Sequence, residues 1–167
     1  MIKKIIITTI SILVCFILQC SVFSRLNIGR IIPNLLIILT ACVGFMEGDM
    51  FGLITGFVCG MLMDVFFSPF NGFYAVIYMY IGYFNGKFCN IFYPEDVKLP
   101  VGLIITSDLI YGISCYVFLF LLRGRFNFSY YLGNIIFPEV IATVIITLCM
   151  YPIILAVHNR LSVNVRV

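Results

Sequence analysis

The sequence predicts an all-α integral membrane protein, a bundle of six transmembrane helices. The first observation is composition, because 63% of the 167 residues are hydrophobic and only 10% are charged, whereas a soluble domain carries roughly 25% charged residues. A soluble protein must still cover its surface with polar groups, so this composition indicates that lipid is the solvent. The second observation is that the apolar residues form runs separated by short polar connections. The chain is therefore expected to be a single transmembrane domain, residues 1–167.

The first two spans follow from where the polar residues interrupt the apolar runs. A helix needs about 20 residues to cross about 30 Å of hydrocarbon. The first run follows Lys3 and Lys4, and no small-residue cleavage site comes after it, so we expect an uncleaved helix rather than a signal peptide. The second run carries Pro33 in its predicted first turn, where a missing N–H is tolerated. It ends before the polar Glu47–Asp49 segment.

The later spans are set by turn residues and two polar breaks. Residues 50–84 would make one helix of roughly 52 Å, which is too long for a single crossing. The Ser68–Gly72 segment supplies Pro, Asn and Gly for a turn inside this stretch. Polar breaks at 87–98 and 123–134 delimit the last two runs. The six predicted spans are 5–23, 31–46, 50–67, 72–86, 99–122 and 135–157.

The distribution of basic residues favours cytoplasmic termini, since positive charge gathers on the cytoplasmic side of a membrane. With six spans, six basic residues lie on the side of the termini and four on the other. The first group is Lys3, Lys4, Lys87, Lys98, Arg160 and Arg166, and the second is Arg25, Arg30, Arg123 and Arg125.

Several functional classes are not expected from this composition. The net charge of +3 is small and scattered, unlike a nucleic-acid-binding surface. The seven cysteines are odd in number and form no CxxC pair, and the one histidine, His158, lies near the C-terminus. We therefore expect neither a disulfide framework nor a metal site, and no cofactor.

The sharpest pattern is a glycine series. Gly48, Gly52, Gly56 and Gly60 recur at every fourth position, and Gly44 precedes them in the same register. On a helix these positions form one ridge without side chains, which lets another backbone approach closely. Two interpretations stay open: a groove that receives a helix of a partner protein, or internal packing of the third span against its own bundle.

Three acidic residues lie in or beside the predicted spans. Asp64 continues the glycine ridge and is expected to cap the following turn, to pair with an arginine, or to contact a partner or ligand. Asp108 is the deepest acid, and Glu139 follows Pro138 near the start of the sixth span, so these two form a possible intramembrane polar site. Their sequence contexts do not match intramembrane aspartyl proteases, and no span contains a histidine base. We therefore do not expect an enzyme.

The segment from Ile32-Pro33-Asn34 to Gly82-Tyr83 carries a family resemblance. Its ordered features are Pro33-Asn34, Glu47-Gly48, Gly52, Gly56-Phe57-x-x-Gly60-x-Leu62-x-Asp64, Gly72, Tyr78 and Gly82-Tyr83. This pattern resembles the rod shape-determining protein MreD family over about residues 30–86, and the last 80 residues resemble it in hydropathy. One departure is the acidic pair Glu47 and Asp49, where the family usually has a basic residue.

The resemblance implies a non-catalytic, multi-pass scaffold in the inner (cytoplasmic) membrane of a bacterium. It implies a role in rod-shape maintenance and peptidoglycan synthesis within the cell-elongation machinery. The implied partners besides membrane lipid are an MreC-like bitopic protein and, indirectly, an MreB-like actin filament and the elongation polymerase and transpeptidase. The implied fold is similar to the substrate-binding subunits of vitamin (energy-coupling factor) transporters.

The residues that the resemblance picks out have two expected roles. We expect the ridge of Gly48, Gly52, Gly56 and Gly60 to hold a partner transmembrane helix. Structural or partner-contact roles are expected for Pro33, Asn34, Asp64, Gly72 and Gly82.

The main rival is a substrate-binding subunit of a vitamin-type transporter. A ligand pocket needs a few polar groups that converge on an apolar cavity. The candidates are Asn34, Thr106, Ser107, Asp108 and Glu139, and sequence alone does not show whether they meet. A third class, an intramembrane hydrolase, predicts loss of activity when Asp64 or Asp108 becomes asparagine.

Overall fold

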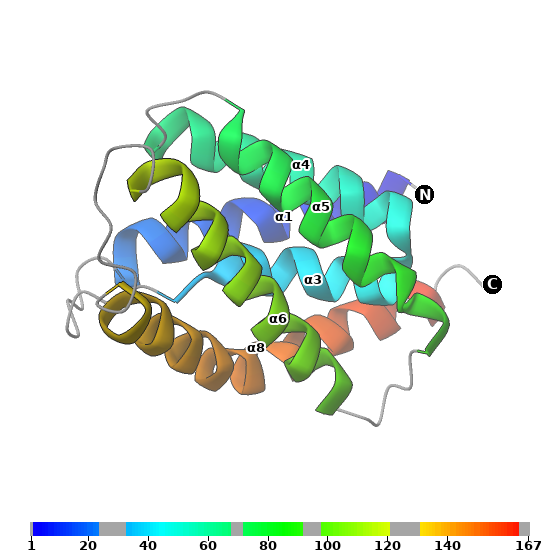
Figure 1. The fold of residues 1–167 in the computed structure, drawn as a ribbon. Helices are drawn as coiled ribbons and strands as arrows, with labels where there is room; N and C mark the ends of the chain where they lie inside the picture. Colours follow the sequence, from blue (N-terminus) through cyan, green and yellow to red (C-terminus); the bar gives the residue numbers. More distant parts are fainter. Residues whose placement is uncertain (1, 24–32, 68–71, 92–97, 121–130, 164–167) are drawn as a thin grey trace.

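A computed structural model describes residues 2–23, 33–67, 72–91, 98–120 and 131–163, and every regular element in these ranges is helical. The six main helices run through the bundle in alternating directions (Figure 1). They are α1 (Ile2–Leu18), α3 (Leu35–Glu47), α4 (Asp49–Phe67), α5 (Phe73–Lys87), α6 (Lys98–Cys115) and α8 (Phe137–Val163). Short π-helical segments extend three of these helices: Gln19–Phe23 follows α1, Tyr116–Phe120 follows α6 and Leu132–Ile136 precedes α8. A 3₁₀ turn, Cys89–Ile91, follows α5.

The described residues confirm an all-helical protein with six main helices. Four helical segments are long and apolar enough to cross a membrane: Lys3–Ser21, Asp49–Phe67, Lys98–Phe118 and Leu132–His158. The helix α3 has 13 residues, which gives about 20 Å at 1.5 Å per residue, less than the hydrocarbon thickness of about 30 Å. Four helices are therefore long and apolar enough to cross a membrane. That all six predicted spans cross it completely stays a prediction.

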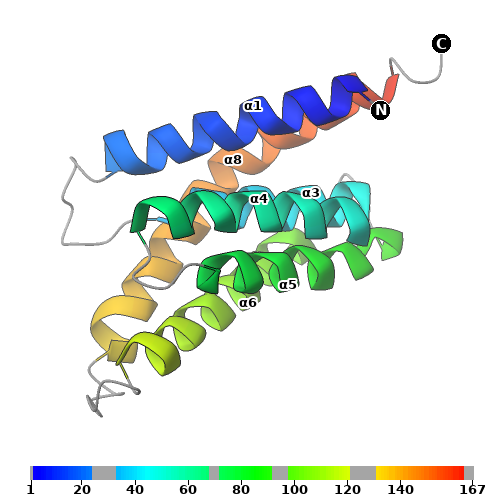
Figure 2. The ribbon, with the colours of Figure 1, turned by 90° about the horizontal axis from the view of Figure 1, so that it is seen from above.

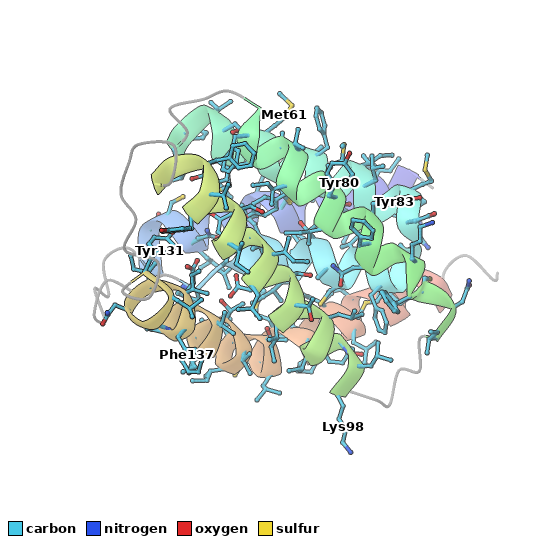
Figure 3. All side chains as sticks on the ribbon, in the orientation of Figure 1. Met61, Tyr80, Tyr83, Lys98, Tyr131 and Phe137 are labelled. Carbon is cyan, nitrogen blue, oxygen red and sulfur yellow. The ribbon has the colours of Figure 1, made fainter. Side chains whose placement is uncertain are left out.

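The short helix α3 is the centre of the bundle. Twelve of its 13 residues are buried, and it contacts each of the other five main helices. Figure 2 shows α1 on one side of the molecule and α6 on the opposite side. Large apolar side chains on the outer helices, such as Met61, Tyr80 and Phe137, point away from the bundle (Figure 3). An apolar exterior of this kind fits a protein surrounded by lipid.

The second predicted span begins later than the sequence indicated. Pro33 was expected inside the first helical turn, but Pro33 and Asn34 precede the helix, and Asn34 is its N-cap. Asparagine is among the preferred N-cap residues, because its side-chain oxygen accepts a hydrogen bond from a free amide of the first turn. At the other end α3 continues to Glu47, and Gly48 alone separates it from α4. Gly48 has a φ of 102°, a conformation that glycine adopts without steric cost.

Of the predicted turn between the third and fourth spans, the structure describes the last residue, Gly72. Residues 68–71 lie outside the described residues, whereas Gly72 is the N-cap of α5 with a φ of 99°. Most of the polar break 123–134 lies outside the described residues as well.

Candidate functional site

The N-terminus of α3 lies within the protein, and its first four amides are all hydrogen-bonded. An α-helix leaves four N–H groups without intrahelical partners, and no water reaches such groups inside a membrane. The acceptors are the carbonyls of Pro33 and Asn34, the side chain of Asn34 and the side chain of Gln19, at 3.2–3.4 Å. The Pro33–Asn34 pair therefore allows a helix to begin in the middle of the bundle.

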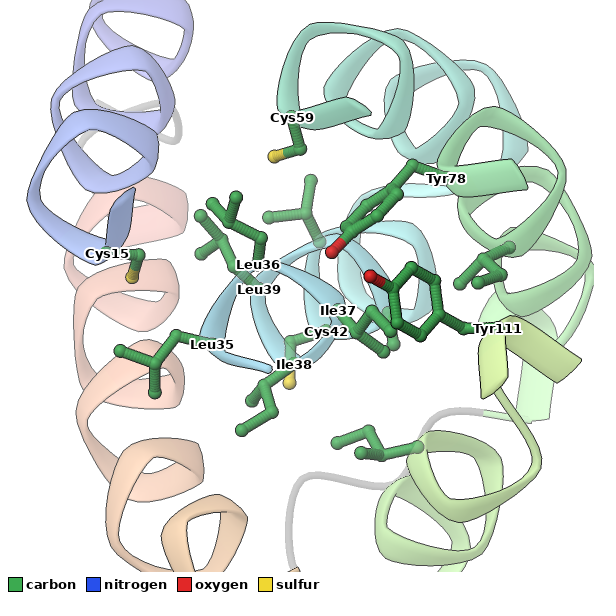
Figure 4. Packing of buried hydrophobic residues seen from close by; sticks show 14 of the residues in the cluster. Cys15, Leu35, Leu36, Ile37, Ile38, Leu39, Cys42, Cys59, Tyr78 and Tyr111 are labelled. Carbon is green, nitrogen blue, oxygen red and sulfur yellow. The ribbon is translucent and has the colours of Figure 1, made fainter. Parts of the chain in front are cut away.

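Asn34 also connects α3 to two other helices. Its side-chain oxygen accepts a hydrogen bond of 2.7 Å from the hydroxyl of Tyr78 on α5, and its backbone amide donates to the Thr143 hydroxyl of α8 at 3.4 Å. The ring of Tyr78 packs edge-on against Tyr111 of α6, with centroids 5.7 Å apart. Figure 4 shows both tyrosine hydroxyls pointing toward one another beside α3. These contacts give Asn34 a structural role.

Asp64 binds the start of α5. Its two carboxylate oxygens accept hydrogen bonds from the amides of Tyr74 (3.0 Å) and Ala75 (2.7 Å). The positive end of a helix dipole and free amides both favour a negative charge there. Among the roles considered from the sequence, the geometry gives Asp64 the capping role next to the turn.

The glycine ridge is filled by α5 of the same chain. An added Cβ at Gly52, Gly56 or Gly60 would overlap backbone atoms of α5, and one at Gly82 of α5 would overlap the backbone of Gly52. Gly44 of α3 approaches the same place, since its Cβ would lie 2.6 Å from the Gly82 carbonyl oxygen. Glycine on both helices lets the two backbones touch. The ridge therefore packs internally, as one of the two interpretations held.

Gly48 differs from the rest of the series. A Cβ there would meet nothing within 4 Å, and its positive φ makes the turn between α3 and α4. From Gly52 to Gly60 the ridge is covered by α5, so little of it is left free for a helix of another protein.

Two carboxyl groups lie in the interior between α6 and α8. Asp108 is 2% exposed, and neither of its oxygens has a hydrogen-bond partner among the described residues. Glu139, half-buried, begins a line of polar side chains along α8 that continues with Thr143 and Thr147 at four-residue intervals. Both threonines are fully buried, so this face of α8 points inward.

The polar groups proposed for a solute pocket do not all converge. Asn34 and Glu139 bond to the Thr143 hydroxyl through their backbone groups, and Asp108 lies beside the same threonine at the α6–α8 contact. Ser107 faces α5 instead and accepts a hydrogen bond of 2.8 Å from the Asn85 side chain. Thr106 is exposed and bonds to the carbonyl of its own helix.

The structure contains a hollow that sequence reasoning missed. An apolar groove of about 340 Å³ lies between α1 and α8, with α3 as its floor; we call it the α1–α8 groove. Its lining residues are Ile7, Thr8, Ile10, Ser11, Val14, Cys15 and Leu18 of α1, Leu39, Val43, Met46 and Glu47 of α3, and Met150, Ile153, Ile154, Val157 and His158 of α8. Residues so far apart in sequence give no local signal of a shared groove.

One end of the α1–α8 groove is closed by an ionic cluster. The carboxylate of Glu47 lies 2.7 Å from Lys4 Nζ and 2.9 Å from His158 Nδ1, which ties together α3, α1 and α8. Partial burial alone would raise the pKa of Glu47, but the hydrogen bonds and charges of His158 and Lys4 outweigh it and lower that pKa below its usual value of 4.5. Glu47, one of the two acids at which the sequence departs from the pattern it resembles, therefore has a structural partner on α1 and another on α8.

Comparison with known proteins identifies the family. The family model described as rod shape-determining protein MreD matches residues 1–161, which includes the C-terminal half that the sequence motifs did not cover. No curated protein and no solved structure matches the chain, so the expected likeness to the substrate-binding subunits of vitamin transporters is not supported. A match over almost the full length leaves no large segment to another family. The chain belongs to the MreD family of rod shape-determining proteins.

Proposed function

We propose that this protein is a non-catalytic membrane scaffold that holds the transmembrane helix of a single-pass, MreC-like protein in the α1–α8 groove. Family membership gives the protein a role in rod shape determination alongside other shape proteins. The observation that carries the proposal is the groove itself. The glycine ridge is already filled by α5, and the groove is an apolar hollow lined by three different helices.

Packing explains why such a groove suits a transmembrane helix. Lipid tails are as apolar as leucine, so helices in a membrane associate through van der Waals contact rather than hydrophobic burial. The side chains that line a hollow lack contacting atoms on one side. Large side chains of a partner helix laid along α1 and α8 supply those contacts. The lining is almost entirely aliphatic, with Thr8 and Ser11 as its uncharged polar members.

The interior polar groups support a scaffold more than an enzyme. Asn34 and Asp64 are used to begin α3 and α5, and Glu47 joins three helices at the end of the groove. A framework fixed in this way keeps the walls of the groove in place for a partner. Through the bound single-pass protein the scaffold acts on peptidoglycan synthesis, indirectly with the MreB-like filament and the elongation polymerase and transpeptidase.

We place the protein in the bacterial inner membrane with both termini in the cytoplasm. In the alternating helix order, Lys3 and Lys4 of α1, Lys87 of α5 and Lys98 of α6 all lie at the same end of the bundle. Basic residues concentrate on the cytoplasmic side of membrane proteins, which supports this orientation.

Two matched substitutions test the groove. Val14 lines the groove and Val76 lies on the outer face of α5, and the two side chains are 49% and 50% exposed. Val14→Phe fills the groove, whereas Val76→Phe adds the same bulk to a face that meets lipid. Each variant is co-expressed with its MreC-like partner, solubilised, and purified through a tag on the MreD family protein.

We expect Val14→Phe to reduce the recovered partner at least fivefold, which corresponds to about 1 kcal/mol of lost interaction. Val76→Phe should leave recovery unchanged. Thermal unfolding of both variants shows whether the fold is intact. Equal recovery of the partner with a folded Val14→Phe variant would rule out the groove as the docking site.

A further inference from the structure

A second feature of the bundle, independent of the groove, is the position of Asp108. It lies ten residues after Lys98, the first residue of α6, so it is about 15 Å along the helix. That places the carboxyl group about halfway across a hydrocarbon layer of about 30 Å. The side chain is 2% exposed, and neither oxygen accepts a hydrogen bond from a described residue. The α1–α8 groove does not reach it, because no residue of α6 lines that groove.

The hydroxyl donors near Asp108 are already committed to other acceptors. The Thr143 hydroxyl lies beside it on α8, but its one hydrogen is donated to the Glu139 carbonyl at 2.9 Å. The Tyr78 hydroxyl of α5 donates to Asn34 of α3 at 2.7 Å. A hydroxyl has one hydrogen to give, so the Thr143 hydroxyl serves the Asp108 carboxyl only by giving up its bond to the Glu139 carbonyl.

The titratable groups that surround Asp108 in the described part of the chain bring no positive charge. They are Glu139 from α8, Tyr78 from α5 and Cys115 from α6 itself, whereas α3 contributes the uncharged Asn34. The described lysines lie at helix ends. Among the described residues, an ionised Asp108 would therefore have a second carboxylate as a charged neighbour and no cation to pair with.

The physical chemistry of this site favours one ligand, a proton. An ionised carboxyl group at the bilayer centre costs about 2.5–3.5 kcal/mol on insertion scales, and a second carboxylate nearby adds repulsion. A proton removes the charge, turns one orphan acceptor into an O–H donor and needs no cavity. A metal cation needs several oxygen ligands, and the described residues contain no cluster of three or more His, Cys, Asp or Glu side chains.

We propose that Asp108 is a proton-binding site inside the membrane, whose carboxyl group holds a proton at neutral pH and shares it with Glu139 of α8. We assign the proton to Asp108 because its side chain is 2% exposed, whereas Glu139 is half-buried. Losing it would leave two negative charges between α6 and α8, which pack against each other. Proton occupancy therefore controls the contact between these helices, a property that the scaffold proposal does not require.

Infrared spectroscopy of the full-length protein tests the proton directly. The protein is purified at pH 7 in a detergent that lacks ester groups, because ester carbonyls absorb where protonated carboxyl groups do. We expect a carbonyl band of a protonated carboxyl in the wild-type spectrum, shifted by exchange into D₂O. Asp108→Asn should remove that band, and Glu139→Gln should keep it, since Asp108 remains buried.

Asp64 provides the matched control inside the same chain. It is also buried, at 5% exposed, but both of its oxygens accept hydrogen bonds from backbone N–H groups, of Tyr74 and Ala75. Asp64→Asn should therefore leave the band intact. Wild-type protein also suffices for a second measurement, labelling with dicyclohexylcarbodiimide, which reacts with protonated carboxyl groups in apolar surroundings. Peptide mass spectrometry should find at least tenfold more label on Asp108 than on Asp64.

Three results would overturn the proposal. The first is a wild-type spectrum at pH 7 without a protonated-carboxyl band. The second is a band that survives in Asp108→Asn but disappears in Glu139→Gln, which would place the proton on Glu139. The third is a band lost on adding sodium chloride but not choline chloride at constant pH, which would make the site a cation site.

Discussion

Because α4 and α5 touch through glycines, we predict that replacing glycine by alanine lowers the stability at one position and raises it at another. Gly56 of α4 lies against the backbone of α5, so that an added Cβ would overlap the carbonyl of Tyr78. Gly102 of α6 is exposed, and a Cβ there would meet nothing within 4 Å. Both glycines lie in helix interiors. Gly56→Ala and Gly102→Ala therefore differ in packing and share the same change in helix propensity.

The magnitude follows from two opposing effects. Alanine is favoured over glycine by about 1 kcal/mol in a helix interior, which stabilises both variants. Overfilling a packed interior costs about 1–3 kcal/mol, and the upper value applies at Gly56 because a backbone carbonyl cannot rotate away. We expect a net loss of about 2 kcal/mol for Gly56→Ala and a gain of about 1 kcal/mol for Gly102→Ala. At about 2–4 °C per kcal/mol, Tm falls by about 4–8 °C in the first and rises by about 2–4 °C in the second.

The cysteines of the chain supply the assay. Cys15, Cys42, Cys59 and Cys115 are free thiols and buried, so a thiol-reactive fluorogenic dye reports unfolding as they become accessible. Each variant is heated in the same detergent as the wild type. If Gly56→Ala unfolds at the wild-type temperature or above it, the close approach of α4 and α5 is not part of the native fold, and the internal reading of the glycine ridge fails.

Two further predictions concern charged groups that hold helix ends. Asp64→Asn removes the negative charge that binds two amides at the start of α5; we expect a loss of about 2 kcal/mol, seen as a lower Tm in the dye assay. Glu47→Gln removes the ionic partner of Lys4 and His158 and should lower stability at pH 7. Because the folded pKa of Glu47 lies below its usual 4.5, its contribution is complete above that pH and is lost as pH falls through the folded pKa. Thermal unfolding followed by circular dichroism should therefore show the wild type and Glu47→Gln converging on acidification, and a gap that persists at pH 3 would contradict this account.

The positions of the helices could be predicted from the sequence because hydropathy measures how long an apolar run is. The predicted span 50–67 corresponds to α4, and the predicted span 72–86 to α5, with Gly72 immediately before it. The start of α3 was misplaced because the helix begins inside the protein, where hydropathy does not change. A signal for that start was present in Asn34, a preferred N-cap residue directly after a proline.

The partner of the glycine ridge also had a signal in the sequence. Gly82 and Gly86 repeat the four-residue spacing on the next helix, and a short turn makes consecutive helices antiparallel neighbours. Two such series on adjacent helices favour internal packing over a surface for another protein. The α1–α8 groove had no comparable signal, because Lys4, Glu47 and His158 meet only in the folded chain. Hydropathy describes the length of a helix but not which face meets which neighbour.

The two buried aspartates show why residue type alone does not identify a functional site. Asp64 and Asp108 are both almost fully buried in apolar helices, and their local sequences do not distinguish their roles. The first has two N–H donors from a helix terminus, which satisfy both of its oxygens. The second has no donor among the described residues. A buried acid with satisfied oxygens stabilises a structure, whereas one with unsatisfied oxygens calls for an explanation, and at Asp108 the one we propose is a bound proton.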